Sequence, residues 1–287
     1  MNKRICEQVA SDSCLTKREL DRLSLVSRKA SEIGGGILMK YYRKIDSINS
    51  KSVQGDLVTN ADIEAEKEVI SFLNSETPEI GIFAEESGIS GPNTDYIWYI
   101  DPLDGTTNYA HGYPFFACSI GLAWKGRPLL GSIRIPFFNE TYWACPGLGS
   151  FCNNESLSVS SVKTLNESLL VTGFAYDRKT TPDNNYAEFC WLTNKSHGVR
   201  RGGSAALDLA FIAAGRLDGY WERGLSPWDI AAGVPIVELA GGIVSDYKNS
   251  TFNLKTGRIL ACNPYIQQEL VFELSKVKPL EAKSFGG

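Results

Sequence analysis

The residues most able to do chemistry together lie just after position 100. Asp101 and Asp104 are separated by two residues and are followed directly by Gly105 and Thr106. An apolar, aromatic run at residues 96–100 predicts a buried strand that ends on the first carboxylate. The proline after that carboxylate holds it in an extended conformation, because residues before proline avoid the α region. Two carboxylates, a bare backbone and hydroxyls suit a hard, oxygen-preferring cation and a phosphate.

Three further acids stand where elements begin or end. Glu85 and Glu86 follow residues 80–84, an apolar run that predicts another buried strand. Adjacent strand residues face opposite sides, so only one of this pair is expected to face a site. Asp229 stands in the first turn of a helix predicted over residues 227–239. Taken alone, Asp104 is equally a cap or turn residue, and Asp229 is an ordinary first-turn acid after Pro227. Brought together at strand ends, they would repel one another unless cations compensate them.

Three motifs resemble those of inositol-monophosphatase-like enzymes, which are magnesium-dependent, lithium-inhibited phosphomonoesterases. Residues 101–108 read DPLDGTTN and resemble the family signature D-P-[IL]-D-G-T-T-N. Residues 228–233 read WDIAAG and resemble the second signature, W-D-x-A-A-G. Residues 81–87 read GIFAEES and resemble the paired acids that follow a strand in the family. The motifs occur in the family's order and together span most of the chain.

The resemblance implies a set of metal ligands. Glu85, Asp101 and the carbonyl of Leu103 would hold a first ion, and Asp101, Asp104 and Asp229 a second. A third, mostly hydrated ion would share Glu85. The expected cofactor is Mg²⁺, two or three ions per site, with Mn²⁺ as a substitute. Glu86 would lie behind the ligands or face solvent.

The resemblance also implies catalytic roles. Thr106 and Glu85 would position the attacking water, and Asp62 would orient Thr106. Gly105 and Thr106 would begin a helix whose free N–H groups bind the substrate phosphate. Lys51 matches a loop lysine that approaches the phosphate. From the residues alone, Asp62 is equally a first-turn helix acid favoured by the dipole, and Lys51 an ordinary solvated lysine.

Substrate contacts are implied by two positions in the second half of the chain. Glu222 matches a residue that accepts a hydrogen bond from a ring hydroxyl, and Ala205 matches a backbone contact to the ring. Asp104 and Asp229 are expected to contact the substrate as well. The small residues around Ala205 equally predict a helix start packed tightly against a neighbour. The basic pair at residues 200–201 is either a rim that recognises a second anion or partner subunit, or a solvated pair.

Composition excludes several classes of protein. The chain has 287 residues, 43% of them hydrophobic and 22% charged, with a net charge of -4, so nothing invites nucleic acid or an anionic membrane. Seven cysteines without C-x-x-C spacing indicate reduced thiols. There is no transmembrane run and no secretory signal pattern. We therefore expect a cytoplasmic protein, or one of an organellar stroma if a transit segment was removed.

The elements predict a layered α+β protein. Residues 16–19 and 59–62 have capping-box spacing and predict helices, the second running to about residue 73. Residues 115–124 and 132–145 predict a long antiparallel hairpin. The resemblance implies a five-layer αβαβα sandwich. We expect one compact unit with a disordered segment at 1–15, a metal-site subdomain at 16–160 and a second subdomain at 161–287 that contributes Asp229.

The predicted function is magnesium-dependent hydrolysis of inositol monophosphate to inositol and phosphate, with a phosphorylated polyol or sugar as substrate. Within the fold, the alternative is a fructose-1,6-bisphosphatase or another sugar phosphatase. Outside catalysis, the alternative is a protein-docking or RNA-processing regulator with incidental activity. A calcium-binding structural domain is disfavoured, because the DPLDG run lacks EF-hand spacing. The resemblance also implies a homodimer, with an interface supplied by the apolar hairpin.

Overall fold

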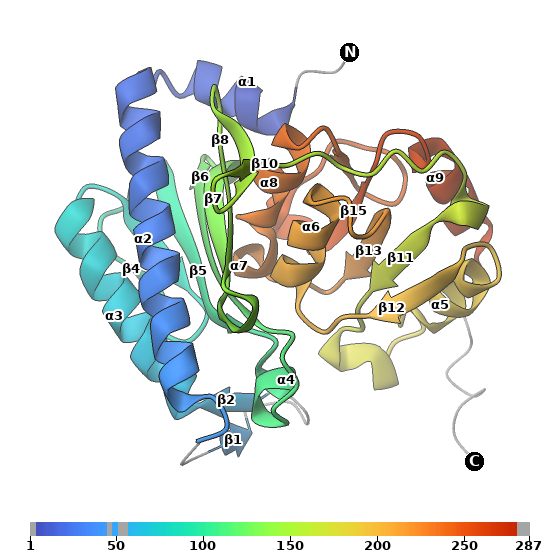
Figure 1. Ribbon diagram of the computed structural model, residues 1–287, viewed down its shortest axis with the longest axis horizontal. Helices are drawn as coiled ribbons and strands as arrows, with labels where there is room; N and C mark the ends of the chain where they lie inside the picture. Colours follow the sequence, from blue (N-terminus) through green and yellow to red (C-terminus); the bar gives the residue numbers. More distant parts are fainter. Residues whose placement is uncertain (1–3, 45–47, 51–56, 280–287) are drawn as a thin grey trace.

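Two sheets divide the fold, with helices outside each sheet and between them (Figure 1). The computed structural model describes residues 4–44, 48–50 and 57–279, with only the backbone at 48–50. Helices α2 and α3 cover the outer face of the larger sheet, and α6, α7 and α8 lie between the sheets. Helices α5 and α9 cover the far face of the smaller sheet. This arrangement confirms the predicted five-layer α+β sandwich.

The larger sheet has eight strands in the order β10-β9-β8-β7-β6-β5-β3-β4. All neighbouring strands are antiparallel except β3 and β5, which are parallel. The strands are β3 (Gly81–Ala84), β4 (Gly88–Ser90), β5 (Tyr96–Asp104), β6 (Ala117–Trp124), β7 (Arg127–Ile135), β8 (Glu140–Cys145), β9 (Gly149–Cys152) and β10 (Glu155–Ser156).

The smaller sheet has five strands in the order β12-β11-β13-β15-β14. Strand β11 is parallel to both of its neighbours, whereas β15 is antiparallel to both of its own. The strands are β11 (Leu169–Thr172), β12 (Gly198–Arg201), β13 (Gly219–Arg223), β14 (Ile243–Ser245) and β15 (Arg258–Cys262). A two-stranded sheet of β1 (Ile48–Ser50) and β2 (Leu57–Thr59) precedes α3.

The helices follow the predicted starts closely where the sequence carries a cap. Thr16 and Glu19 form a capping box at the start of α2, and Thr59 and Asp62 form one at the start of α3. The helices are α1 (Ile5–Asp12), α2 (Lys17–Tyr41), α3 (Asn60–Glu76), α4 (Thr106–Ala110), α5 (Tyr186–Thr193), α6 (Ala205–Ala213), α7 (Pro227–Ile230), α8 (Gly233–Leu239) and α9 (Gln267–Lys276). Short 3-10 helices occupy Pro136–Phe138, Leu165–Glu167, Tyr176–Lys179 and Leu254–Thr256.

The expectation that residues 1–15 are disordered is wrong for the part of this segment that the structure describes. Helix α1 buries Cys6 and Val9 completely. The backbone N–H groups of Ile5 and Cys6 donate to the Glu238 carboxylate of α8 at 3.1 and 3.0 Å. A carboxylate at a helix N-terminus satisfies N–H groups that have no partner within the helix. This anchor lies more than two hundred residues away along the chain, so the local sequence does not signal it.

Two other predicted elements are divided by prolines. Residues 132–145 form β7 and β8 with a 3-10 turn between them that begins at Pro136. The single helix expected over 227–239 is two helices, α7 and α8. Pro235 lies in the first turn of α8 and has no N–H to donate to a carbonyl four residues earlier, so the backbone ladder is interrupted there.

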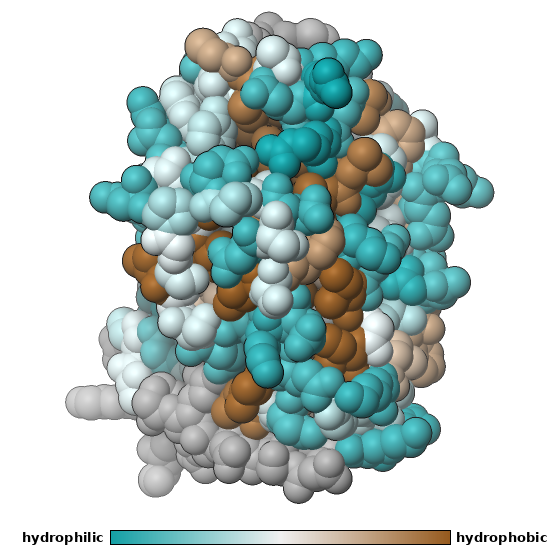
Figure 2. Space-filling model, turned by 90° about the vertical axis from the view of Figure 1, so that its left-hand side faces the viewer, coloured by the Kyte–Doolittle hydropathy of each residue, from teal (hydrophilic) through white to brown (hydrophobic). Residues whose placement is uncertain are grey.

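Three apolar cores join the layers. One lies between α2, α3 and the larger sheet, one between the two sheets, and one between the smaller sheet and α9. Figure 2 shows the outer face formed by α2 and α3, where apolar side chains are interspersed with hydrophilic ones. Exposed Leu25, Met39 and Ile63 lie on these helices. Isolated apolar side chains of this kind are normal on a protein surface. Within the described residues, no helix is both long enough and apolar enough to span a membrane.

Candidate active site

A β-bulge in β5 places Asp101 and Asp104 on the same side. Asp101 pairs with Ser119 and Asp104 with Ala117, so β5 has one more residue than β6 between these pairs. Without the extra residue, two positions three apart on a strand would point to opposite faces. Pro102 lies inside the bulge, where its missing N–H breaks no ladder bond. Both aspartates consequently line one pocket of about 440 Å³, called here the acidic pocket.

Glu85 enters the acidic pocket from the neighbouring strand. Its N–H donates to the carbonyl of Ile100 at 3.1 Å, which continues the parallel pairing of β3 with β5. This pairing brings the Glu85 carboxyl close enough to that of Asp101 for its charge to raise the pKa of Asp101. Glu86 is not among the lining residues, and its N–H donates to Glu66 at 2.8 Å. The structure therefore directs Glu85, and not Glu86, into the pocket.

Asp229 reaches the pocket from the other half of the chain. It lies in α7, and its carboxylate accepts a hydrogen bond from the N–H of Ser226 at 2.7 Å. Trp228 packs edge-on against Phe83 of β3, with ring centroids 5.0 Å apart, and holds α7 against the larger sheet. Asp104 makes a second link between the halves. Its Oδ2 accepts from the Ser204 hydroxyl and the Ala206 N–H at 2.8 and 2.6 Å, at the start of α6.

The electrostatics of these carboxyls are those of buried like charges. Burial and the neighbouring Glu85 raise the pKa of Asp101 well above its usual range. Burial and Asp104 do the same to the pKa of Asp229. The pKa of Asp104 rises to about 6, mainly through burial and against the hydrogen bonds from α6. An ionised cluster of this kind needs positive charge to offset its repulsion.

A left-handed glycine and a buried threonine follow the bulge. Gly105 has φ +95, and a Cβ there would lie 2.9 Å from the carbonyl oxygen of Phe115, so only glycine fits. The Thr106 hydroxyl lies 3.0 Å from the Leu103 carbonyl and 3.3 Å from Asp62 Oδ1. The other oxygen of Asp62 accepts from the N–H and hydroxyl of Thr59. Burial raises the pKa of Asp62 to about 6.

The predicted substrate residues lie on the opposite wall. Ala205 begins α6, and Glu222 is on β13; both line the acidic pocket. Tyr220 donates its hydroxyl to Glu222 at 2.7 Å. Burial raises the pKa of Glu222 to about 7, although this hydrogen bond and the nearby Arg201 oppose the rise. Of the basic pair at 200–201, Arg201 alone lines the pocket.

Sequence reasoning missed one wall of the acidic pocket. Phe174, Ala175, Tyr176 and Arg178 line it from the segment that follows β11. The available signal was their position directly after a predicted strand, at an edge where sites collect. Lys51 was the remaining predicted site residue, and it lies outside the described residues.

The donor set of the pocket fits a hard divalent cation. The carboxyls of Glu85, Asp101, Asp104 and Asp229 and the Leu103 carbonyl supply only oxygen. Among the described residues that line the pocket there is no histidine or cysteine. Oxygen ligands of this kind suit Mg²⁺ and Mn²⁺. As the side chains stand, no three carboxyl groups in the described part of the chain converge on one point at ligating distance. One oxygen of Asp101, Asp104 and Asp229 each is fixed by a backbone N–H, which orients the three side chains.

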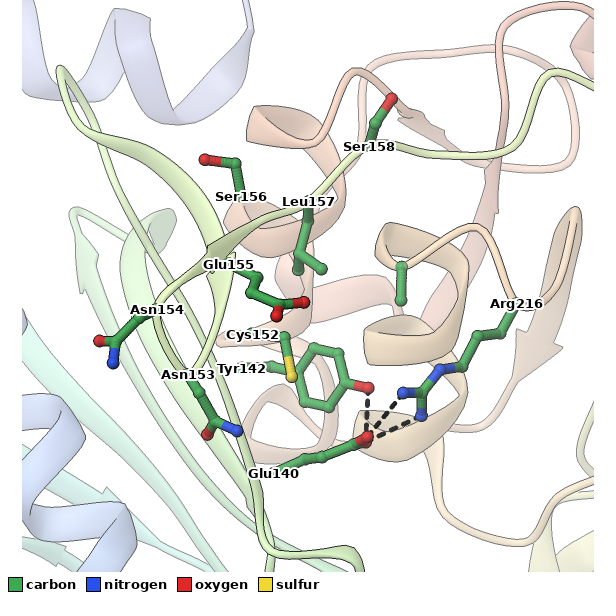
Figure 3. A pocket seen from close by; sticks show the side chains of 11 residues that line it. Glu140, Tyr142, Cys152, Asn153, Asn154, Glu155, Ser156, Leu157, Ser158 and Arg216 are labelled. Atoms are coloured by element: carbon green, nitrogen blue, oxygen red, sulfur yellow. Dashed lines mark hydrogen bonds and ion pairs between the residues drawn. The ribbon is translucent and has the colours of Figure 1, made fainter.

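A second cleft, of about 560 Å³, lies beside Arg216 at the end of α6 and is called here the Arg216 cleft (Figure 3). One of its acids, Glu140, has partners that neutralise its charge. Arg216 donates two hydrogen bonds to Glu140, at 2.8 and 2.6 Å, and Tyr142 donates a third at 2.7 Å. Despite partial burial, Arg216 and Tyr142 hold the pKa of Glu140 below its ordinary value. This cleft therefore contains a neutralised carboxylate rather than a charged cluster.

Comparison with known proteins decides the family. The model of the Inositol monophosphatase family matches residues 19–278. The chain belongs to the inositol monophosphatase family. It is 50% identical over 246 residues to the inositol-1-monophosphatase of Synechocystis sp., which covers 85% of this chain and 86% of that protein. It is also 41% identical over 245 residues to a Pseudomonas aeruginosa protein named Nus factor SuhB, covering 83% of this chain and 90% of the relative.

Solved structures agree with the sequence comparison. The inositol monophosphatase structure from Anabaena (Nostoc) sp. matches with a TM-score of 0.83 and 47% identity, over 92% of this chain and 99% of that one. An IMPase from Thermotoga maritima matches with a TM-score of 0.80 and 33% identity, over 89% and 97%. These relationships confirm the resemblance and the fold. The protein is a phosphoric monoester hydrolase of a family that is generally metal-dependent.

Proposed function

We propose that the protein hydrolyses inositol monophosphate to inositol and phosphate, with Mg²⁺ as its cofactor. One observation carries the proposal: carboxyls from three separate parts of the chain, Glu85, Asp101 with Asp104, and Asp229, line one pocket, although burial and mutual repulsion oppose their charged forms. Similarity to proteins named as inositol monophosphatases supports the substrate. The pocket, of about 440 Å³, has room for a small phosphorylated ring.

The ligand assignment follows the carboxyls that line the pocket. Glu85, Asp101 and the Leu103 carbonyl are proposed to hold one ion, and Asp101, Asp104 and Asp229 another. A third, more hydrated ion would share Glu85. When bound, Mg²⁺ supplies positive charge that offsets the phosphate oxygens and the developing alkoxide of the leaving group. The buried carboxyls supply the opposite charge, which holds that cation in place.

Thr106 and Asp62 are proposed to position the attacking water through hydrogen bonds. The Thr106 hydroxyl carries one proton and lies within hydrogen-bond distance of both Asp62 and the Leu103 carbonyl. When the hydroxyl donates its hydrogen bond to Asp62, a lone pair on the threonine oxygen is free to accept a hydrogen bond from the attacking water. Glu85 would accept the second hydrogen bond from that water. Asp62 is a positioning residue, because α3 and Thr59 fix its carboxylate from behind. We also propose that Lys51 approaches the phosphate.

The phosphate is proposed to lie on the bare backbone at Gly105 and Thr106, where the chain leaves β5 for α4. On the opposite wall, Glu222 would accept a hydrogen bond from a ring hydroxyl, and the backbone at Ala205 would contact the ring. Asp104 and Asp229 face the same space and would meet the substrate from the metal side. The substrate thus spans from the acidic cluster to β13.

The first experiment is phosphate release from a panel of esters, with Mg²⁺ and with a chelator. The panel holds inositol 1-phosphate, fructose 1,6-bisphosphate, histidinol phosphate and adenosine 3′,5′-bisphosphate. We expect magnesium-dependent release with preference for inositol 1-phosphate, and inhibition by lithium. Preference for fructose 1,6-bisphosphate would overturn the substrate assignment in favour of the sugar phosphatase alternative. Absence of release from every ester would overturn the proposed function and favour a docking role.

We propose three further properties of the protein. The homodimer is expected to form through the apolar hairpin. Light scattering at assay concentration tests it, and a monomer would contradict it. The other two are a cytoplasmic location and no direct binding to nucleic acid. For the docking alternative, a variant without turnover that retains the cellular phenotype would separate partner binding from catalysis.

A further inference from the structure

The wall of the acidic pocket that faces the substrate ring is built by residues 173–185, which connect β11 to α5. Phe174, Ala175, Tyr176 and Arg178 of this segment line the pocket. The last two lie on the 3-10 turn Tyr176–Lys179. The aromatic ring and the guanidinium line the pocket together with Glu222, and they form a surface that can select among the alcohol parts of phosphate esters.

The two ends of the segment are held together behind the pocket. Asn185 donates its side-chain amide to the carbonyl of Gly173 at 2.7 Å. The indole N–H of Trp221 donates to the amide oxygen of the same asparagine at 2.6 Å. Asn185 and Trp221 are both almost completely buried. The segment is therefore a closed loop whose base is fixed to β13, the strand that carries Glu222.

The first residues of the segment pack directly on Glu222 and its neighbours. A Cβ on Gly173 would lie 2.1 Å from Glu222 Oε1, so the carboxylate rests against the bare backbone. A Cβ on Gly224 would lie 2.5 Å from the Cβ of Ala175, so these two backbones also touch closely. The position of the wall and the position of the Glu222 carboxylate consequently depend on each other.

The middle of the segment is tied by Arg223. Its two terminal nitrogens donate to the two carboxylate oxygens of Asp177, one of them at 3.0 Å. Its Nε lies 4.0 Å from Asp183 Oδ2, and Asp183 in turn pairs with Arg258. The Arg223 side chain is only 12% exposed, whereas that of Asp177 is 54% exposed. Adjacent strand residues face opposite sides, so Glu222 faces the pocket while Arg223 binds Asp177 of the segment 173–185.

We propose that Arg223 is a positioning residue that sets substrate preference. By holding Asp177, it fixes the turn that presents Tyr176 and Arg178 to the alcohol part of the substrate. The bidentate fork constrains both distance and orientation, which a single ammonium contact cannot do. Arg223 does not touch the substrate or the carboxyls of the metal site. The inference deepens the proposed function and rests on it.

The test compares inositol 1-phosphate with an aryl phosphate, p-nitrophenyl phosphate, which offers no ring hydroxyls. In Arg223→Met we expect KM for inositol 1-phosphate to rise about tenfold with kcat changed less than about twofold. For the aryl phosphate both constants should change less than about twofold. Arg223→Lys keeps the charge without the fork and should fall between Met and the natural residue. Asp177→Asn should match Arg223→Met, and the double variant should add little to either.

Arg216→Met is the matched control. It removes an equally bidentate arginine–carboxylate pair, with Glu140, that lies in the Arg216 cleft and not at the acidic pocket (Figure 3). The ratio of kcat/KM for the two substrates should be unchanged in this control. If it falls as far as in Arg223→Met, the role of Arg223 is general stability and the inference is wrong.

Other outcomes are equally decisive. Equal loss on both substrates in Asp177→Asn, whose exposed side chain can be changed without unfolding the protein, would overturn the inference. An unchanged ratio in Arg223→Lys, Arg223→Met and Asp177→Asn would do so as well. Failure of the proposed function is visible separately, because the natural protein would then not hydrolyse inositol 1-phosphate. In that case the ratio is taken with the best polyol phosphate of the panel.

Discussion

The acidic pocket and the Arg216 cleft are similar in size and both contain carboxylates, yet they handle negative charge in opposite ways. In the Arg216 cleft, Arg216 and Tyr142 satisfy Glu140, and the pKa of that carboxyl falls. In the acidic pocket, burial and neighbouring acids raise the pKa values of Asp101 and Asp229. Arg178 and Arg201 line the same pocket, but neither is ion-paired within the described residues.

If the proposed function holds, this difference distinguishes a reactive pocket from a structural one. A paired carboxylate contributes to folding and leaves nothing for a ligand to neutralise. A cluster of buried, like-charged carboxyls costs stability, so its presence indicates that something bound there supplies positive charge. Cavity size does not separate the two, because the Arg216 cleft is the larger, at about 560 against 440 Å³.

The largest difference between the two regions should appear when one carboxylate charge is removed from each of them and turnover is measured. Asp101→Asn or Asp229→Asn should lower kcat at saturating Mg²⁺ by about a thousandfold or more, because each removes a proposed metal ligand. Glu140→Gln, the matched change in the Arg216 cleft, should alter turnover less than about twofold. Phosphate release from inositol 1-phosphate measures both. Near-normal turnover in either aspartate variant would contradict the metal-site assignment.

Smaller losses of kcat are expected for substitutions of Thr106 and Asp62, which are not proposed as metal ligands. Thr106→Val keeps the side-chain shape but loses the hydroxyl, and should lower kcat about a hundredfold. Asp62→Asn should cost about tenfold, because the hydroxyl keeps an alternative acceptor in the Leu103 carbonyl.

Thr141→Val is the control for the loss of a buried hydroxyl, since Thr141 accepts from Arg134 on β7. Its turnover should be that of the natural protein. Single-turnover kinetics on inositol 1-phosphate would separate the chemical step from substrate binding. A Thr106→Val variant with a normal chemical step would refute the proposed role of the hydroxyl.

Sequence predicted the acidic pocket better than it predicted the wall opposite. Asp101, Asp104 and Gly105 are neighbours in the chain, and a strand followed by proline and glycine places them through local geometry. The caps at Thr16 and Thr59 are local as well, and both predicted helix starts are confirmed.

The features that sequence missed depend on partners far apart in the chain. Glu238 caps α1 from 232 residues away, and Arg223 holds Asp177 from 46 residues away. Neither pair has a spacing that marks it, because the contact exists only once the sheets have packed. The division of residues 132–145 was missed for another reason: aromatic and β-branched residues continue through Pro136, so the strand pattern hid the turn.

The acidic pocket should also make the stability of the metal-free protein depend on pH. Burial raises the pKa of Asp104 from 3.8 to about 6 and that of Glu222 from 4.5 to about 7. At a pH between the unfolded and the folded pKa of either group, the folded protein binds more protons than the unfolded chain. The contribution of these groups is fully present below about pH 4 and is lost as pH rises through about 6 and 7.

Urea unfolding in the presence of a chelator measures this dependence. We expect these groups to make the free energy of unfolding about 4 kcal/mol lower at pH 8 than at pH 5, and Mg²⁺ to restore much of the loss at pH 8. A metal-free protein whose stability does not fall over this range would show that the carboxyls are not strained by burial. Asp104→Asn should flatten the dependence.

The smallest expected effect separates the two regions most clearly, because substitutions in them should change the free energy of unfolding in opposite directions. Arg216→Met leaves Glu140 with the Tyr142 hydroxyl but without its positively charged partner, and should lower the free energy of unfolding by about 1 kcal/mol, since the pair is partly exposed. Asp101→Asn removes one of several like charges while an amide oxygen can still accept from the Leu103 N–H. In the metal-free protein at pH 8 it should therefore raise stability. With Mg²⁺ present its advantage should shrink or reverse, because the natural protein gains more from the ion. If both substitutions destabilised the metal-free protein equally, the acidic pocket would be an ordinary hydrogen-bonded cluster, and its raised pKa values would not indicate a cation site.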